Sequence, residues 1–291
     1  MKKIVLLLAV GLMTLGLQAQ EKKAEITFET DVIDVISDIV EREINPTIYK
    51  PPSFSNTSGF PSVFKRSKGP ILSRKRNKNI SSFKVDFSDK NDIRIFLKKL
   101  KNEKDIYGVI NCYGIQNPIG KFKDIDFSLW EDNLKLNFIN FAFFIHKLLP
   151  ITNDIKKIIA FSGGGATFGR ENFSAYAIAK IALYKYLEIL SIELEKDKID
   201  LNLIAPGAIK SKMTEQIIER GSSLGKEYES ASDIIDSGGQ DKENILDLCR
   251  LLLSKKSNGL SGRLFAAQWD NIDNYDINEL INDKNLFTLK R

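Results

Sequence analysis

A tyrosine and a lysine lie four residues apart in the segment Tyr176-Ala-Ile-Ala-Lys180. On a helix, this spacing places the phenol and the ammonium group one turn apart on the same face. A neighbouring cation stabilises phenolate and lowers the pKa of tyrosine from about 10 toward neutral pH, so Tyr176 is a candidate general acid or base. An ordinary exposed pair has the same spacing, so the surrounding sequence must decide between the two interpretations.

A serine and three glycines precede this pair. Ser162 follows a short apolar run and opens the loop Ser-Gly-Gly-Gly, fourteen residues before Tyr176. A serine hydroxyl beside the phenol can donate a hydrogen bond to a substrate carbonyl, and glycines allow a ligand to approach the backbone. The alternative is a plain glycine turn. The single histidine and two cysteines argue against a Ser-His-Asp triad, a His-based zinc site and a disulfide scaffold, so we predict no metal.

Short apolar runs alternate with helical patterns from about residue 82 onward. Strands are expected at 83–87, 107–111, 157–162, 200–204 and 260–267, and helices at 89–101, 128–149, 174–196 and 243–253. This alternation predicts an α/β fold with a doubly wound parallel sheet, which is Rossmann-like. Ligands of such sheets bind at the carboxyl ends of the strands, where Asp86, Asn111, Gly114, Ser162 and Pro206 are expected.

In this arrangement the chain resembles a short-chain dehydrogenase/reductase over about residues 70–270. The resemblance rests on motifs that occur in the family's order and spacing: Asn111-Cys-Tyr-Gly114, Asn137 within its helix, Phe161-Ser-Gly-Gly-Gly-Ala-Thr167, Tyr176-Ala-Ile-Ala-Lys180, Pro206-Gly207-Ala-Ile-Lys-Ser211 and Leu260-Ser-Gly-Arg-Leu-Phe-Ala-Ala267.

The resemblance implies a role for each catalytic candidate. Tyr176 would exchange a proton with the oxygen of a substrate alcohol or carbonyl, and Lys180 would lower its pKa and bind the nicotinamide ribose. Ser162 would polarise the carbonyl. Asn137 would hold a helix kink and a water molecule of the proton relay.

The same resemblance implies NAD or NADP as the cofactor, which would supply the hydride. The residues expected to contact it form one set: Asp86 beside the adenine, Asn111 and Gly114 along the cleft, Tyr176 and Lys180 at the ribose, Pro206, Gly207, Ile209 and Ser211 around the nicotinamide, and Arg74 near an adenosine 2′-phosphate. The segment 210–240 would form a mobile lid over the substrate.

The N-terminal third departs from the family pattern. The glycine-rich turn Thr-Gly-x-x-x-Gly-x-Gly, which would bind the pyrophosphate, is not found, so the first βα unit is predicted to be missing or replaced. One candidate for its strand is 26–36. Residues 1–20 have the layout of a secretory signal peptide, with a buried first strand or helix as the alternative. Residues 21–69 read as irregular, and 271–291 as a C-terminal tail.

The leading hypothesis is therefore an NAD(P)-dependent oxidoreductase that interconverts a secondary alcohol and a ketone. The alternative is a degenerate, non-catalytic binding or scaffold protein that lacks nucleotide binding. The basic cluster within 65–78 is interpreted as a solvated loop, so we expect a small-molecule alcohol or ketone and no nucleic acid as partner. We further expect no stable membrane span, a cytoplasmic location, and a homodimer or homotetramer built through helices 128–149 and 174–196.

Overall fold

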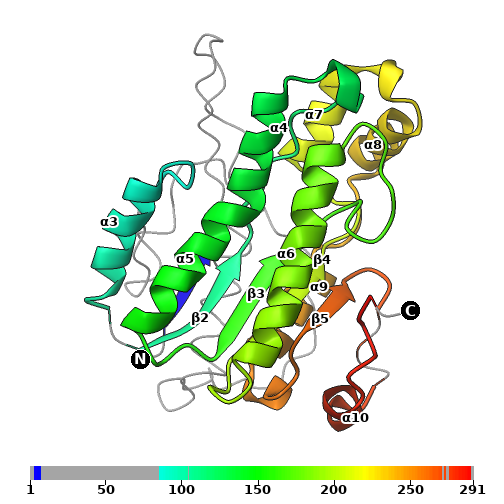
Figure 1. The fold of residues 1–291 in the computed structure, drawn as a ribbon. Helices are drawn as coiled ribbons and strands as arrows, with labels where there is room; N and C mark the ends of the chain where they lie inside the picture. Colours follow the sequence, from blue (N-terminus) through cyan, green and yellow to red (C-terminus); the bar gives the residue numbers. More distant parts are fainter. Residues whose placement is uncertain (1–2, 8–84, 104, 271, 273–274, 290–291) are drawn as a thin grey trace, which may run out of the picture.

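Among the described residues, the sheet has five parallel strands, in an order that follows the sequence (Figure 1). The computed structural model describes residues 3–7, 85–103, 105–270, 272 and 275–289. In spatial order, the strands are β1 (Lys3–Leu7), β2 (Ile106–Asn111), β3 (Lys157–Phe161), β4 (Asp200–Ala205) and β5 (Arg263–Ala266). The predicted strands at 107–111, 157–162, 200–204 and 260–267 are confirmed within a few residues.

Helices cover both faces of this sheet, as the doubly wound prediction requires (Figure 1). One face packs against α3 (Lys90–Leu100), α5 (Asn140–Leu148) and α6 (Ser174–Glu193), while α9 (Glu243–Leu253) and α10 (Ile277–Asn282) pack against the other. Successive strand residues alternate between the two cores: Val109 faces the first and Ile110 the second. Both faces are therefore apolar, which explains why the strands read as continuous hydrophobic runs.

β1 pairs in parallel with Ile106–Asn111 of β2. It therefore fills the position beside β2 that would be empty if the first βα unit were missing. The N-terminal apolar run thus contains a strand, which was the alternative to the signal-peptide interpretation. The rest of that run, the candidate strand at 26–36 and the basic cluster lie outside the described residues. The strand predicted at 83–87 is wrong where it is described, because Val85 and Asp86 have no regular structure and Phe87 begins a turn before α3.

The helix predicted at 128–149 is interrupted in its middle. It consists of α4 (Phe127–Leu134), a π-helical segment at Lys135–Ile139, and α5. Asp126 caps its start by accepting a hydrogen bond from Ser128 N at 2.8 Å. Of the helices in the described residues, only the stretch Phe127–Ile151 is long and apolar enough to cross a membrane. Phe141 and Phe144 of this stretch are buried in the core, as expected for a core helix.

The predicted lid contains two helices, α7 (Lys212–Arg220) and α8 (Lys226–Ser237), which lie beyond the carboxyl ends of the strands (Figure 1). Their apolar side chains Ile217 and Ala231 pack with Ile119 and Phe173 from the loops after β2 and β3. The described part of the C-terminal tail also packs on the body, because Leu264 N donates a hydrogen bond to Phe287 O at 2.9 Å.

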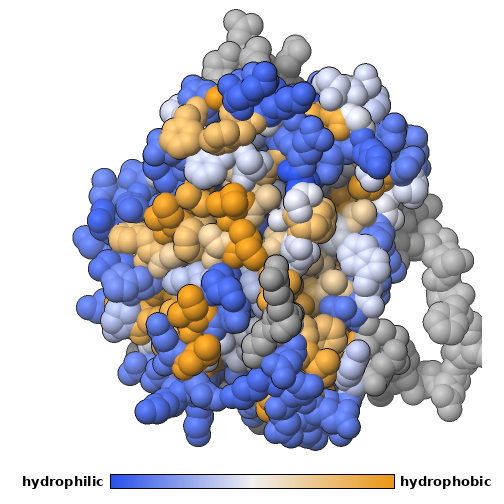
Figure 2. All heavy atoms as spheres, turned by 45° about the vertical axis from the view of Figure 1, so that its right-hand side comes forward, coloured by the Kyte–Doolittle hydropathy of each residue, from blue (hydrophilic) through white to orange (hydrophobic). Residues whose placement is uncertain are grey.

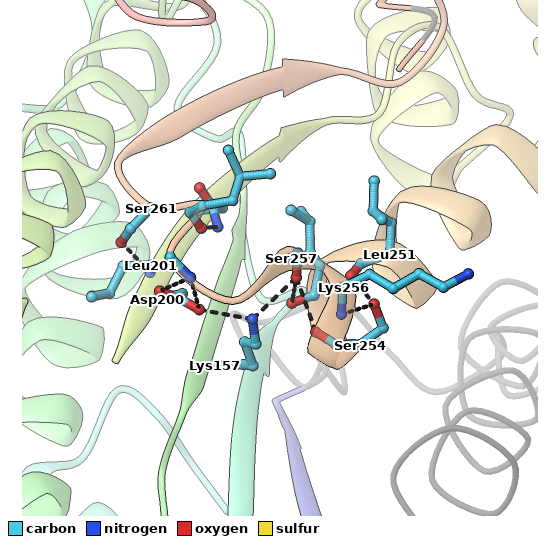
Figure 3. A network of polar contacts seen from close by, with 12 residues as sticks. Lys157, Asp200, Leu201, Leu251, Ser254, Lys256, Ser257 and Ser261 are labelled. Atoms are coloured by element: carbon cyan, nitrogen blue, oxygen red, sulfur yellow. Dashed lines mark hydrogen bonds and ion pairs between the residues drawn. The ribbon is translucent and has the colours of Figure 1, made fainter. Parts of the chain in front are cut away.

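A buried polar network ties the strands together at their amino ends, which is the edge opposite the lid. Lys157 Nζ lies 2.7 Å from Asp200 Oδ2 and 3.1 Å from Ser257 Oγ (Figure 3). Gly259 N also donates to the Asp200 carboxylate. This network fixes the 3₁₀ turn before β5 onto β3 and β4, and it uses a lysine that is almost fully buried.

Candidate active site

Tyr176 and Lys180 lie on the first turns of α6, where the helix passes the carboxyl end of β3. Tyr176 is 5% exposed and Lys180 is 2% exposed. Lys180 Nζ lies 5.5 Å from the centroid of the Tyr176 ring and donates a hydrogen bond to Phe161 O at 2.8 Å. The bond to the last residue of β3 fixes the ammonium group under the loop that starts at Ser162, so the pair is a built site rather than an exposed helix pair.

Burial decides the charge state of this pair. It raises the pKa of Tyr176 to about 12, against the positive charge of Arg170, which lowers it. It lowers the pKa of Lys180 to about 8. The expectation that the pKa of Tyr176 falls toward neutral pH is therefore wrong for this structure, because enclosure of the phenol outweighs the nearby cations. At neutral pH the phenol carries its proton and can act as a proton donor.

Ser162 offers an unused hydroxyl at the end of β3. Its side chain is 4% exposed, and its Oγ has no hydrogen-bond partner among the described residues. The backbone is fixed, since Ser162 N donates to Ile204 O at 2.8 Å. An unsatisfied buried hydroxyl costs about 1–3 kcal/mol, so a ligand carbonyl or hydroxyl that bonded this Oγ would recover that free energy.

Gly163 brings the phenol to the serine. A Cβ atom at this position would overlap the hydroxyl group of Tyr176, so the phenol oxygen rests directly against the residue that follows Ser162. This role of Gly163 was missed from the sequence, where the only signal was its place in the Ser-Gly-Gly-Gly loop. Gly163 thus leaves room for the Tyr176 phenol against the loop that Ser162 opens, and no hydrogen bond joins the two hydroxyl groups in the described structure.

Asn137 lies inside the π-helical segment and holds the loop after β2. Its Oδ1 accepts a hydrogen bond from Ile115 N at 2.9 Å, and its Nδ2 donates to Ile115 O at 2.8 Å. The Nδ2 group also donates to Asn133 Oδ1 at 2.7 Å, and Asn133 in turn donates to Asn117 O. The predicted helix irregularity at Asn137 is present. Asn133, its buried partner, was missed because a single asparagine on a helix carries no distinctive signal.

The loop after β2 meets the candidate site at Gly114. A Cβ atom there would lie 3.1 Å from Asn137 Oδ1 and 3.2 Å from Lys180 Nζ, so the structure brings these three residues together. Asn111 is buried and accepts a hydrogen bond from Tyr113 N at 3.1 Å, which shapes the same loop. Burial raises the pKa of Tyr113 to about 12, and the charge of nearby Asp86 adds to that shift.

The residues predicted around a nicotinamide form a turn after β4. Gly207 has a φ of +82°, a conformation that favours glycine. Two glutamines that the sequence did not indicate hold this turn: Ala208 N donates to Gln240 Oε1 at 2.8 Å, and Gln268 Nε2 donates to Pro206 O at 3.2 Å.

The same segment then leads into the lid. Thr214 Oγ1 donates to Ile209 O at 3.0 Å and lies 3.3 Å from Ser211 Oγ. Gln116, a further residue that the sequence did not indicate, donates to Met213 O at the start of α7. This hydrogen bond joins two residues that are almost one hundred positions apart in the sequence. Arg74, the candidate for an adenosine 2′-phosphate, lies outside the described residues.

These residues fit the nicotinamide half of a dinucleotide. Gly114, Gly163 and Gly207 keep side chains away from the strand ends, while the unpartnered Ser162 Oγ and the Lys180 ammonium group provide polar contacts. Hydroxyl groups and an amide of a ribose and nicotinamide need such donors. The segment that would hold the pyrophosphate and the adenosine falls outside the described residues.

Comparison with known proteins shows what the chain as a whole is similar to. A family model described as enoyl-(acyl carrier protein) reductase matches residues 67–267. The dehydrogenase/reductase SDR family member 4 of Caenorhabditis elegans is 28% identical over 135 residues, which is 43% of this chain and 49% of that protein. A 3-amino-tetrahydro-pyrrolizinone reductase of Xenorhabdus hominickii is 23% identical, with 58% of this chain and 57% of that protein covered. The chain therefore spans about half the length of these curated relatives.

Solved structures show the same fold. A short chain dehydrogenase family protein from Francisella tularensis superposes with a TM-score of 0.55 at 24% identity, covering 63% of this chain and 78% of that chain. Levodione reductase superposes with a TM-score of 0.56 at 18% identity, covering 65% and 75%. These likenesses confirm the Rossmann-like fold that the alternating pattern predicts.

Proposed function

Because the chain belongs to the short-chain dehydrogenase/reductase family, we propose that it is an NAD(P)-dependent oxidoreductase that interconverts a secondary alcohol and a ketone. The observation that carries the proposal is the meeting of Tyr176, Ser162 and Lys180 at the end of β3. The phenol oxygen rests against Gly163, the residue after Ser162, whose buried Oγ has no hydrogen-bond partner among the described residues. Lys180 Nζ is bonded to Phe161 O, the residue before Ser162.

Each side chain then has one task in the reduction of a carbonyl. Ser162 donates a hydrogen bond to the carbonyl oxygen, which stabilises the charge that develops there. Tyr176 donates its proton to the same oxygen. Lys180 places positive charge near the phenolate that remains, and Asn137 keeps the loop after β2 in place. When bound, the reduced nicotinamide supplies the hydride.

The protonation state of the resting site favours reduction over oxidation at neutral pH. Since the pKa of Tyr176 is raised to about 12, the phenol holds the proton that ketone reduction consumes. Alcohol oxidation needs the deprotonated phenol as a base, so it should become faster as the pH rises. The ratio of the reduction rate to the oxidation rate should therefore fall as the pH rises.

The cofactor and the surroundings of the enzyme are part of the proposal. Either NAD or NADP would serve, and the complex of Pseudomonas aeruginosa RhlG with NADP shows that a protein of the same fold takes NADP. A cytoplasmic location would give access to both. We also propose a homodimer or homotetramer built through the helices at 128–149 and 174–196, where Ile139, Ile178 and Ile192 are among the exposed apolar residues. Figure 2 shows hydrophobic side chains gathered on one face of the molecule.

The test is the loss of reduced-nicotinamide absorbance with a panel of ketones, using NADH and NADPH in turn. We expect consumption of one cofactor with at least one ketone, and a fall of at least 10²-fold in Tyr176→Phe. Calorimetric titration of both proteins with each cofactor is the companion measurement. Tight binding in both would support the proposal, whereas no binding and no turnover would favour the non-catalytic scaffold that the missing glycine-rich turn suggests.

A further inference from the structure

An arginine in the loop between β3 and α6 is bonded to the lid. Arg170 Nε donates to Glu227 Oε1 at 3.0 Å, and its Nη2 donates to Glu227 Oε2 at 2.6 Å. Glu227 lies in the first turn of α8, whereas Arg170 lies six residues before Tyr176. The paired geometry is the strong, orientation-specific form of an arginine–carboxylate contact. The arginine side chain is 13% exposed, so the pair is screened less than a surface ion pair.

The same arginine packs against the loop that carries Ser162. A Cβ atom at Gly164 would lie 3.4 Å from Arg170 Nη1, and one at Gly165 would lie 3.1 Å from its Cβ. Its guanidinium carbon lies 3.8 Å from the centroid of the Phe173 ring, which is fully buried beside the first turn of α6. Arg170 thus contacts the glycine loop, the entry to α6 and the lid at once.

Arg170 also acts on Tyr176 through its charge. Two cations face the phenol from the elements around it: Lys180 from α6 itself, and Arg170 from the preceding loop. Glu227 from α8 faces the arginine and offsets its charge. Any movement of α8 away from the loop would therefore change both the position of the arginine and the electrostatic potential at the phenol.

We propose that Arg170 is a positioning residue that joins α8 of the lid to the Ser162 loop, so that closure of the lid over a substrate aligns Tyr176 for proton transfer. The inference rests on the proposed function and deepens it. It assigns to the Arg170–Glu227 pair a role that neither residue could fill alone, because one partner stands on the catalytic loop and the other on the lid.

The test uses Arg170→Met and Glu227→Gln, which break the same contact but leave opposite charges behind. Both variants should raise KM about tenfold, because the bond that joins α8 of the lid to the Ser162 loop is lost. In the alcohol-oxidation direction, the rise of kcat with pH should move to higher pH in Arg170→Met, which loses a cation, and to lower pH in Glu227→Gln, which leaves that cation uncompensated. Glu229→Gln, an exposed carboxylate on the same turn of α8, is the matched control and should change neither parameter.

A second measurement does not depend on turnover. Hydrogen exchange in α7 and α8 should increase in Arg170→Met and Glu227→Gln, while exchange in α9 stays unchanged, and the swapped double variant R170E/E227R should restore protection. Faster exchange without any ketone reduction by the wild-type chain would contradict the proposed function but leave the link between loop and lid in place. Unchanged exchange in both single variants, or pH shifts in the same direction, would overturn the inference.

Discussion

Tyr176 and Lys180 are both driven toward their uncharged forms by burial, the phenol with a pKa of about 12 and the amine with a pKa of about 8. Keeping a lysine charged at neutral pH in this position costs free energy that its bond to Phe161 O recovers only in part. Burial of these two ionisable groups therefore lowers the stability of the fold, as is common at catalytic sites.

Replacement of Lys180 should consequently stabilise the fold while removing activity. The pKa shift from 10.5 to about 8 corresponds to about 3 kcal/mol, and the lost hydrogen bond offsets about 1 kcal/mol of it. We expect Lys180→Met to raise the free energy of unfolding by about 2 kcal/mol near neutral pH, measured by urea denaturation.

The pH dependence of this effect has a definite sign. Between pH 8 and 10.5 the unfolded chain holds the Lys180 proton and the folded chain does not, so wild-type stability rises relative to the variant. The advantage of Lys180→Met should therefore disappear as the pH rises through that interval. Lys185→Met, at an exposed position on the same helix, should stay within about 0.5 kcal/mol of wild type. A constant difference at all pH values would refute this explanation.

Gly163 should tolerate no side chain. In Gly163→Ala the new methyl group overlaps the Tyr176 hydroxyl, so the phenol must move away from Ser162. We expect kcat to fall by at least tenfold and the free energy of unfolding to fall by about 1–3 kcal/mol, the usual cost of overpacking a buried site. Gly169→Ala in the same loop is the control, since a Cβ atom there meets nothing within 4 Å. Equal activity of the two variants would show that the phenol is not held at Gly163.

At the scale of elements, the π-helical segment between α4 and α5 is what aims Asn137 at the loop after β2. Such segments are frequent at functional sites. Asn140 follows it on the same helix and donates to Phe87 O at 2.6 Å, away from Ser162. The two buried amides thus bind different loops, which allows structural and catalytic effects to be separated.

Both asparagines should matter for stability, but only one for chemistry. Asn137→Ala and Asn140→Ala each leave buried backbone groups without a partner, so each should lower the free energy of unfolding by about 1–3 kcal/mol. Only Asn137→Ala should reduce kcat, because Ile115 and Gly114 lose their support beside Lys180. Steady-state kinetics will measure kcat of both variants, and chemical denaturation will measure their free energies of unfolding. A matching loss of kcat in Asn140→Ala would mean that global loosening is responsible.

The Lys157–Asp200 pair is the corresponding stability element at the opposite edge of the sheet (Figure 3). Burial lowers the pKa of Lys157, and the carboxylate of Asp200 opposes that shift. Asp200→Asn removes the compensating charge and should cost about 3–5 kcal/mol of stability, with kcat of the surviving folded enzyme unchanged. The exposed pair Lys135–Asp132 supplies the control, since Asp132→Asn should cost less than about 1 kcal/mol.

At the scale of the whole molecule, local sequence patterns were sufficient to predict the strands and helices that have a regular hydrophobic period. The alternation of apolar runs and helical patterns predicted four of the five described strands and both long helices, while the motifs of the resemblance singled out Tyr176, Lys180, Ser162 and Asn137. Gly163, Asn133 and Gln116 were not predicted, because their contacts join segments that are distant in sequence and carry no pattern of their own.

The N-terminal apolar run is a segment for which the sequence pattern allows two interpretations. A parallel strand covered on both faces and the apolar region of a signal peptide are both continuous hydrophobic runs, so the sequence of Lys3–Leu7 fits either. The structure pairs Lys3–Leu7 with β2, a long-range contact across about one hundred residues that no local pattern indicates. The pKa of Tyr176 was mispredicted for a related reason: burial is a property of the assembled fold.

The most direct test of the proposed chemistry follows the hydride itself. NADH and NADPH deuterated at the transferable position are incubated with the chain and a ketone, and the alcohol is analysed by mass spectrometry. We predict one deuterium on the carbinol carbon of the product from one of the cofactors, and no labelled product from Tyr176→Phe. Absence of label from both cofactors, with a folded chain and a broad ketone panel, would contradict the assignment of this site to hydride transfer.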